Sequence, residues 1–263
     1  MKGIILAAGE GKRLRPLTQD IPKSMVNFCG TTLLERQIEV MQKCGINDII
    51  VITGYKAEKI NIPNINYLKN KNFEKTNMIE TLFCAENELV GDVIVSYADI
   101  IYEKNILEKL IQSEEEISIV IDKKWEDYWK KRFDDPLKDA ESLKIDEDGN
   151  ISEIGQKANN IAEIEGQYIG LMKFDSKGVK VLREFYKKCK EKSENGRNVL
   201  NPNIEFERSY MTDLLQGLIL SGSKLKPIVI EKGWLEFDSI NDYHLYQKMS
   251  NEKNLTELIN LDK

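Results

Sequence analysis

The residues nearest the start of the chain have the types and spacing of a site for an anion. An apolar run over residues 3–8 leads into residues 9–13 (GEGKR), and the tripeptide PKS follows at 22–24. Glycine and alanine let backbone N–H groups approach an anion closely, and glycine tolerates the positive φ that a wrapped loop often needs. Arg13 adds planar donors suited to phosphate oxygens, and Lys23 adds a second positive charge. This segment predicts either a polyphosphate site or an ordinary turn between a strand and a helix.

Two common phosphate-binding motifs do not fit this loop. A Walker loop requires G-x-x-x-x-G-K-[ST], which the segment lacks. The dinucleotide fingerprint G-x-G-x-x-G requires a third glycine where this chain has Leu14. Both classes of nucleotide-binding protein are therefore disfavoured.

The same residues resemble a known family. The stretch LAAGEGKRLRPLT at 6–18, followed by PKSM at 22–25, is similar to the signature of nucleotidyltransferases that couple nucleoside triphosphates to phosphorylated acceptors. The resemblance implies that the loop wraps the triphosphate, that Arg13 and Lys23 are catalytic and neutralise phosphate charge, and that the backbone before the loop helps to read the base. The nucleotide contacts it implies are Leu6, Ala7, Ala8, Gly9, Gly11, Lys12, Thr76, Asn77 and Ala98.

The resemblance also implies a metal site built from two distant aspartates. Asp99 follows an apolar, strand-like run, and Asp238 lies in residues 233–239 (GWLEFDS), which resemble a late segment of the family. In the family these aspartates hold magnesium, which favours one or two carboxylates together with phosphate and water. Without the family, Asp99 could cap a loop or helix, and Ser239 with Asp242 could form a capping box beside Asp238.

Residues 72–82 favour CTP as the nucleotide. Where sugar nucleotidyltransferases commonly have a Gln-Pro-x-Gly-x-Ala stretch, this chain has Thr76, Asn77 and Met78, which resembles the small cytidylyltransferase branch. Thr76 and Asn77 could present donors and acceptors to cytosine and ribose, or they could simply cap the helix that follows.

A polar and aromatic segment over residues 123–170 is expected to bind the acceptor. Aromatic rings with carboxylates can hold an ammonium group, and the alternative is an amphipathic helix that docks its aromatic side chains on the core. The segment resembles cytidylyltransferases that act on phosphocholine, 2-aminoethylphosphonate or phospho-L-glutamine. Lys157 or Arg132 would take the phosphoryl group, and Glu165, Asp134 or an aromatic ring would face the nitrogen. The predicted acceptor contacts are Trp125, Trp129, Arg132, Lys157, Glu165, Tyr168 and Asp213.

An α/β fold must position these residues. Strand-like and helix-like segments alternate, which predicts a Rossmann-like, mostly parallel mixed sheet flanked by helices, with a smaller inserted acceptor-binding lobe at about 123–170 and 195–225. Such sheets bind ligands beyond the carboxyl ends of their strands, where Gly9, Gly11 and Asp99 would lie. The expected strands cover residues 3–8, 48–53, 65–68, 93–97 and 117–121, and the expected helices cover 31–44 and 78–89.

The length and composition limit the domain count and the partners. A chain of 263 residues can bury one substantial core, so we expect a single domain over residues 1–250. Residues 251–263 form a tail that either packs against a second subunit, giving a homodimer, or frays. The net charge of −6 disfavours a nucleic-acid partner. Four dispersed cysteines indicate reduced thiols, and no apolar stretch is long enough for a bilayer, so we expect a cytoplasmic protein without a membrane partner.

Together these features predict a Mg²⁺-dependent cytidylyltransferase. An acceptor phosphate or phosphonate oxygen would attack the α-phosphorus of CTP and release pyrophosphate, which leaves a CDP- or CMP-linked product for surface polysaccharide modification. Phospho-L-glutamine is the favoured acceptor, with phosphocholine and 2-aminoethylphosphonate as alternatives. A sugar-1-phosphate nucleotidyltransferase making a UDP-, dTDP- or CDP-sugar, and an inactive nucleotide-sensing domain, are the competing functions.

Overall fold

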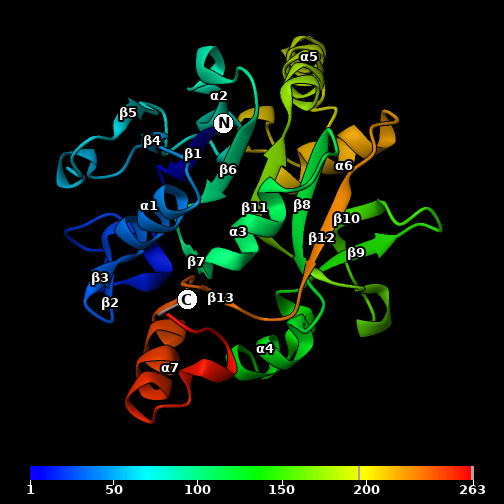
Figure 1. Ribbon diagram of the computed structural model, residues 1–263. Helices are drawn as coiled ribbons and strands as arrows, with labels where there is room; N and C mark the ends of the chain where they lie inside the picture. The colour runs from blue at the N-terminus through cyan, green and yellow to red at the C-terminus, as the bar shows by residue number, and fades with distance from the viewer. Residues whose placement is uncertain (195, 262–263) are drawn as a thin grey trace.

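A seven-stranded sheet forms the centre of the computed structural model, which describes residues 1–194 and 196–261 (Figure 1). Its strand order is β12-β8-β11-β6-β1-β4-β5. Strand β11 runs antiparallel to both of its neighbours, and the other six strands share one direction. The strands are β1 (Lys2–Ala7), β4 (Asp48–Thr53), β5 (Asn66–Lys69), β6 (Val93–Tyr97), β8 (Ile117–Asp122), β11 (Gln167–Phe174) and β12 (Lys226–Ile230). The predicted mostly parallel mixed sheet is confirmed.

Helices cover both faces of this sheet because its central strands are apolar on both sides. In β1, Ile5 packs into the core on one face, whereas Ile4 packs into the core on the other. The first face is covered by α1 (Leu33–Lys43), α3 (Lys104–Ile111), α4 (Trp125–Arg132) and α7 (Ile240–Asn251). The second face is covered by α2 (Met78–Phe83), α5 (Ser176–Glu194) and α6 (Met211–Leu220).

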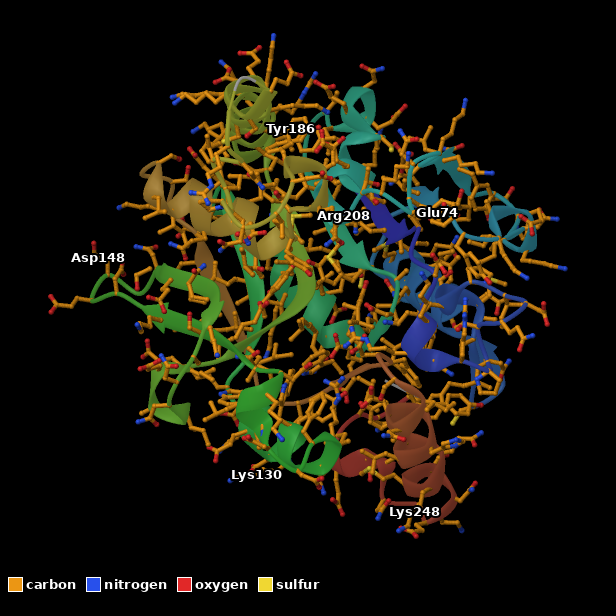
Figure 2. The ribbon with its side chains drawn as sticks, turned by 180° about the vertical axis from the view of Figure 1, so that it is seen from behind. Glu74, Lys130, Asp148, Tyr186, Arg208 and Lys248 are labelled. Carbon is orange, nitrogen blue, oxygen red and sulfur yellow. The ribbon has the colours of Figure 1, made fainter. Side chains whose placement is uncertain are left out.

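Three two-stranded sheets and several single-turn helices complete the fold. The small sheets pair β2 (Asn27–Phe28) with β3 (Thr31–Thr32), β7 (Ile100–Tyr102) with β13 (Trp234–Glu236), and β9 (Glu141–Ile145) with β10 (Ile151–Lys157). The single 3₁₀ turns are Lys12–Leu14, Lys23–Met25, Ala57–Lys59, Glu86–Glu88, Pro136–Lys138, Ile161–Glu163, Phe206–Arg208 and Leu255–Glu257. Figure 2 shows Asp148 at the tip of the β9–β10 hairpin, directed away from the body of the protein.

Local sequence signals account for where several elements begin and end. Thr32 and Glu35 form a capping box at the start of α1, and Gly45 follows the helix with a φ of +82°. The expected helix over 78–89 is shorter, because α2 ends at Phe83 and a separate 3₁₀ turn follows at Glu86–Glu88. A turn joins β9 to β10, and Gly149 occupies it with a φ of +78°. No helix of the described residues is long and apolar enough to span a bilayer.

The C-terminal tail packs against its own chain. The 3₁₀ turn Leu255–Glu257 follows α7, and Leu255, Leu258 and Ile259 are 7%, 3% and 2% exposed in the same apolar cluster as Trp234. The backbone N–H of Gly233 donates to the carbonyl of Leu258 at 2.7 Å. Up to residue 261 the tail therefore packs within its own chain, and the homodimer stays a prediction; residues 262–263 lie outside the described part.

The buried tail makes a stability prediction. Replacing Leu258 with alanine removes a 3% exposed side chain from the core and should lower the free energy of unfolding by about 2–5 kcal/mol. Leu220→Ala is the matched control, because Leu220 is 79% exposed at the end of α6, and it should cost less than about 0.5 kcal/mol. Urea unfolding followed by circular dichroism measures both, and equal small losses would show that the tail frays.

Candidate active site

A cavity of about 560 Å³ opens at the carboxyl ends of β1 and β6, where β11 begins. This is the edge where parallel sheets bind ligands. The structure brings most of the predicted site residues to its wall. They are Leu6, Ala7, Ala8, Gly9, Gly11, Lys12, Arg13, Lys23, Thr76, Asn77, Ala98, Asp99, Trp129, Tyr168 and Asp238.

The glycine-rich loop is held against the segment that carries Lys23. Gly11 adopts a left-handed conformation with a φ of +63°, and its carbonyl accepts a 2.7 Å hydrogen bond from the Oγ1 of Thr18. A Cβ added at Gly11 would lie 2.9 Å from the Cβ of Lys23, so a larger residue would force the two segments apart. Gly11 is thus required both for the backbone conformation and for the close approach.

One ammonium group joins the two predicted metal ligands. The Nζ of Lys23 lies 2.7 Å from Oδ2 of Asp99 and 3.3 Å from Oδ1 of Asp238. The Nη2 of Arg13 lies 2.7 Å from the same oxygen of Asp238. The side chains of Lys23, Asp99 and Asp238 are only 13–17% exposed, whereas Arg13 is 70% exposed. Two carboxylates far apart in the sequence therefore converge on one buried cation.

The small sheet of β7 and β13 brings these aspartates together. Ile100 pairs with Glu236, and the backbone N–H of Phe237 donates to the carbonyl of Asp99 at 2.9 Å. Asp99 precedes β7 and Asp238 follows β13, so antiparallel pairing places them side by side. The capping box considered from the sequence is also present, since Ser239 and Asp242 cap α7 while Asp238 remains free to face the cavity.

The two aspartates fit a hard divalent cation. Oδ1 of Asp99 is buried without a hydrogen-bond partner among the described residues, and carboxylate oxygens are the donors that Mg²⁺ prefers. Burial works to lower the pKa of Lys23, but the attraction of Asp99 and Asp238 outweighs burial and raises that pKa. Within residues 1–194 and 196–261, no group of three or more His, Cys, Asp or Glu side chains could hold a metal ion. Oxygens of a bound nucleotide would have to complete the coordination of a cation at Asp99 and Asp238.

Glu236 is a cavity residue that the sequence analysis did not assign. Burial raises its pKa to about 7, the ion pair with Arg132 works against this shift, and repulsion from Asp99 and Asp238 adds to it. Its Oε2 lies 2.7 Å from Nη1 of Arg132. Its place in the site could have been predicted from its spacing to Asp238. Side chains two residues apart in an extended segment point the same way, and Glu236 precedes Asp238 by two.

Thr76 and Asn77 lie at the start of α2, where Asn77 alone caps the helix, and their contact with a nucleotide stays a prediction. Asn77 is the N-cap of α2, and its Oδ1 accepts from the backbone N–H of Met78 at 2.9 Å. Thr76 accepts a 2.9 Å hydrogen bond from the Nδ2 of Asn70. Both residues nevertheless line the cavity, so capping does not remove them from a nucleotide site.

Helix α4 uses its aromatic side chains for packing, as the alternative interpretation held. Trp125, Tyr128 and Trp129 are 2–4% exposed in the core shared with α7. The Nε1 of Trp125 donates to the carbonyl of Ile164 at 3.2 Å, away from the cavity. Of the two predicted tryptophans, only Trp129 reaches the cavity wall. Figure 2 shows Lys130 of the same helix pointing outward.

Five predicted acceptor contacts lie outside the cavity, namely Trp125, Arg132, Lys157, Glu165 and Asp213. The side chain of Arg132 is fully buried beneath the site, where it pairs with Glu236 and Asp242. Asp213 accepts from the backbone N–H of Tyr210 at 2.8 Å and so caps α6. Glu165 is exposed and accepts from the backbone N–H of Ile145 at 2.6 Å. Lys157 is exposed at the end of β10.

Beside the predicted Tyr168, four further residues line what we call the acceptor side of the cavity. We use this term for the part lined by Asp139, Glu141, Gln167, Tyr168 and Thr212, on β9, β11 and α6 or beside them. Glu141 is exposed to solvent at the cavity, yet desolvation by the protein around it, followed by repulsion from Asp213 and Asp139, raises its pKa to about 7. Because Glu141 comes from a different sheet than the phosphate loop, its place in the cavity follows from tertiary packing and not from local sequence.

Comparison with known proteins identifies the class. Residues 3–148, more than half of the chain, match the model of the MobA-like NTP transferase domain. The chain therefore belongs to this family and is a nucleotidyltransferase, which confirms the resemblance seen in its first 25 residues. A CTP:phosphoglutamine cytidylyltransferase from Campylobacter jejuni is 41% identical over 257 residues, which cover 92% of this chain and 97% of that protein.

Other relatives share part of the sequence or the fold. The choline-phosphate cytidylyltransferase of Streptococcus pneumoniae is 34% identical over 117 residues, 43% of this chain and 51% of that protein. The solved structure of a CTP:phosphocholine cytidylyltransferase from Streptococcus pneumoniae has a TM-score of 0.69 and 22% identity, with 95% of this chain and 98% of that chain covered. An inositol-1-phosphate CTP transferase from T. maritima has a TM-score of 0.68 and 20% identity, covering 98% of this chain and 97% of that chain. At these identities the two structures show a shared fold.

The raised pKa of Glu236 predicts how stability depends on pH. Its ordinary pKa is 4.5 and its folded value is about 7, so between these values the folded protein keeps a proton that the unfolded chain has released. The free energy of unfolding should therefore fall as the pH rises through this window. In Glu236→Gln the fall should be smaller, as urea unfolding between about pH 5 and 8 without nucleotide or metal would show. Glu147→Gln, at an exposed hairpin position, is the control, and parallel slopes in all three proteins would contradict the assignment.

Proposed function

We propose that this protein is a Mg²⁺-dependent cytidylyltransferase that transfers CMP from CTP to a small phosphorylated acceptor bearing an amino group, with phospho-L-glutamine as the acceptor. The observation that carries the proposal is the convergence of Asp99 and Asp238 on Lys23, beside Arg13 and the glycine-rich loop. Identity of 41% over nearly the whole length with a CTP:phosphoglutamine cytidylyltransferase supports the choice of both substrates.

The reaction joins two anions, so the protein must mainly neutralise charge. An oxygen of the acceptor phosphate forms a bond to the α-phosphorus of CTP, the bond from that phosphorus to the bridging oxygen breaks, and pyrophosphate leaves. Arg13 and Lys23 donate to phosphate oxygens where negative charge develops, in a partly enclosed site that strengthens these interactions. Mg²⁺ held by Asp99 and Asp238 would supply further charge neutralisation at the reacting phosphate.

Lys23 is placed to exchange partners during the reaction. In the free site its ammonium compensates both carboxylates at 2.7 and 3.3 Å. Asp99 and Asp238 would hold a divalent cation, which would supply this positive charge, and the ammonium of Lys23 would then be available to donate to the triphosphate.

No general base is required for this chemistry. The acceptor's phosphate is already ionised near neutral pH and attacks without losing a proton. The chain's one histidine, His244, is exposed on α7 and does not line the cavity. The proposed mechanism therefore depends on positioning and charge, in agreement with the residues that the cavity offers.

The acceptor side of the cavity suits the amino group of the acceptor. Glu141 lines the cavity with no ion-pair partner among the described residues, and Asp139 also faces the cavity. An ammonium group placed here would favour the ionised form of Glu141, whose pKa desolvation raises to about 7. We propose that Glu141 takes the role that the sequence analysis gave to Glu165.

A pyrophosphate-release screen tests the function. The purified protein with MgCl₂ is given each of CTP, UTP, dTTP, GTP and ATP together with phospho-L-glutamine, phosphocholine, 2-aminoethylphosphonate or hexose 1-phosphates. We expect CTP with phospho-L-glutamine to give the highest kcat/KM and a CDP-linked product, which would suit transfer to a surface polysaccharide. Preference for UTP or dTTP with a hexose phosphate would instead indicate a sugar nucleotidyltransferase. Triphosphate binding without turnover of any pair would indicate a nucleotide-sensing domain.

Glu141→Gln tests the proposed amine contact. Loss of the carboxylate should raise the KM for phospho-L-glutamine about tenfold or more, the range for a charged hydrogen bond, and should change the KM for CTP little. Glu165→Gln is the matched control, since Glu165 is an exposed carboxylate outside the cavity, and it should leave both values near wild type. Equal effects of Glu141→Gln on both substrates would contradict a contact to the acceptor.

A further inference from the structure

A buried glutamine on α1 holds the turn that carries Asp99. Gln37 is 1% exposed and lies among the apolar residues of the helix face that packs on the sheet. Its Nε2 donates to the carbonyl of Tyr97 at 3.0 Å and to that of Ile100 at 2.6 Å. Its Oε1 accepts from the Oγ of Ser96 at 2.7 Å. A single amide thus binds the backbone on both sides of Ala98 and Asp99.

The cost of burying this amide indicates a specific role. A polar group in a core stabilises the fold only when its hydrogen bonds are made, and an apolar side chain would fill the same space. Gln37 uses both Nε2 hydrogens and its carbonyl oxygen, so its three bonds all go to residues 96–100. Its neighbours on the same helix face, Leu34, Ile38 and Met41, are apolar and make the packing contacts.

The bonds from Gln37 restrain the backbone carbonyls of Tyr97 and Ile100, which the pairing of β7 with β13 does not hold. The N–H of Phe237 holds the carbonyl of Asp99 from one side, and Gln37 holds the flanking carbonyls of Tyr97 and Ile100 from the other. The turn is therefore restrained from two directions, and its aspartate side chain projects into the cavity with one oxygen on Lys23 and one unpaired.

We propose that Gln37 is a positioning residue for Asp99, which sets the direction of the metal-binding carboxylate through the backbone of the β6–β7 turn. The inference rests on the proposed function, because it requires that Asp99 binds the catalytic cation. Without the amide, the carbonyl of Ile100 loses its side-chain donor and that of Tyr97 keeps only the 3.2 Å bond from the Ser96 Oγ, so the turn relaxes to find other donors. The carboxylate then binds the cation less tightly, as happens when groups that orient metal ligands are removed.

Gln37→Met tests this role, because methionine has similar length and flexibility but no donor. The probe is Mn²⁺, titrated by electron paramagnetic resonance in the presence of a non-hydrolysable CTP analogue. We expect Mn²⁺ to bind about tenfold more weakly or worse than to the wild type. In turnover assays we expect a lower kcat and a higher Mg²⁺ requirement, with an unchanged KM for the acceptor.

Two controls separate positioning from general destabilisation. Met41→Ala removes a fully buried side chain of the same helix that packs against Gly3 at the far end of β1, so it should lower stability without changing Mn²⁺ affinity. Ser96→Ala removes the bond to Oε1 and the 3.2 Å bond from the Ser96 Oγ to the carbonyl of Tyr97, but it leaves both Nε2 bonds in place, so the loss of affinity should stay below about threefold. If Gln37→Met does not fold, Gln37→Glu keeps the size and the acceptor, and it should weaken Mn²⁺ as strongly because its carboxylate faces two carbonyls.

Asp99→Asn distinguishes the two possible failures. If Asp99→Asn binds Mn²⁺ as the wild type does, the proposed metal site is wrong. If Asp99→Asn loses Mn²⁺ while Gln37→Met, or Gln37→Glu in its place, binds it with wild-type affinity, only the positioning role is wrong. Equal weakening in Gln37→Met and Met41→Ala would likewise reduce Gln37 to a general stability residue.

Discussion

The attraction between Lys23 and the carboxylates of Asp99 and Asp238 is the interaction on which the rest of this site depends. Two partly buried carboxylates would repel each other, and the ammonium 2.7 and 3.3 Å away compensates that repulsion. The same geometry leaves one oxygen of Asp99 unpaired, so the site satisfies its charges without satisfying all of its hydrogen bonds. The unpaired oxygen of Asp99 is therefore available to the cation that the proposed function requires.

Contacts in the surrounding fold hold the segments that carry these three side chains in place. The β7–β13 pairing aligns the two aspartates, the capping box of Ser239 and Asp242 fixes the segment after Asp238, and Gln37 restrains the turn before Asp99. Arg132 adds a support from below, since its guanidinium pairs with Glu236 and Asp242 and lies 5.0 Å from the ring centre of Trp129. Helix α4 and helix α7 lie side by side for this reason (Figure 1).

The parts of the site that the sequence predicted are those in which the signal is local. Consecutive residues encode the glycine-rich loop, the strand that precedes it and the strand that ends at Tyr97. In the structure these elements lie within a residue or two of the expected bounds. The acceptor side could not be read in this way. The aromatic residues of α4 have the same spacing in the sequence whether they bind a ligand or pack on the core. Their burial in the structure shows that they pack on the core. Glu141 reaches the cavity through the pairing of β9 with β10 and the contact of α6 with that hairpin, which no local pattern encodes.

The groups proposed for the triphosphate and those on the acceptor side come from different elements of the fold. The groups proposed to handle the triphosphate come from the ends of β1 and β6 in the central sheet and from the segment after β13, which pairs with β7 in a separate small sheet. The groups on the acceptor side come from β9, the start of β11 and the first turn of α6, where Gly155 approaches Thr212 so closely that a Cβ would lie 2.3 Å from the Cβ of that threonine. Substitutions on the β9–β10 hairpin can therefore change the shape of the acceptor side while Asp99 and Asp238 keep their geometry. In the proposed mechanism, the groups that bind the acceptor therefore come from other elements than the groups that perform the transfer.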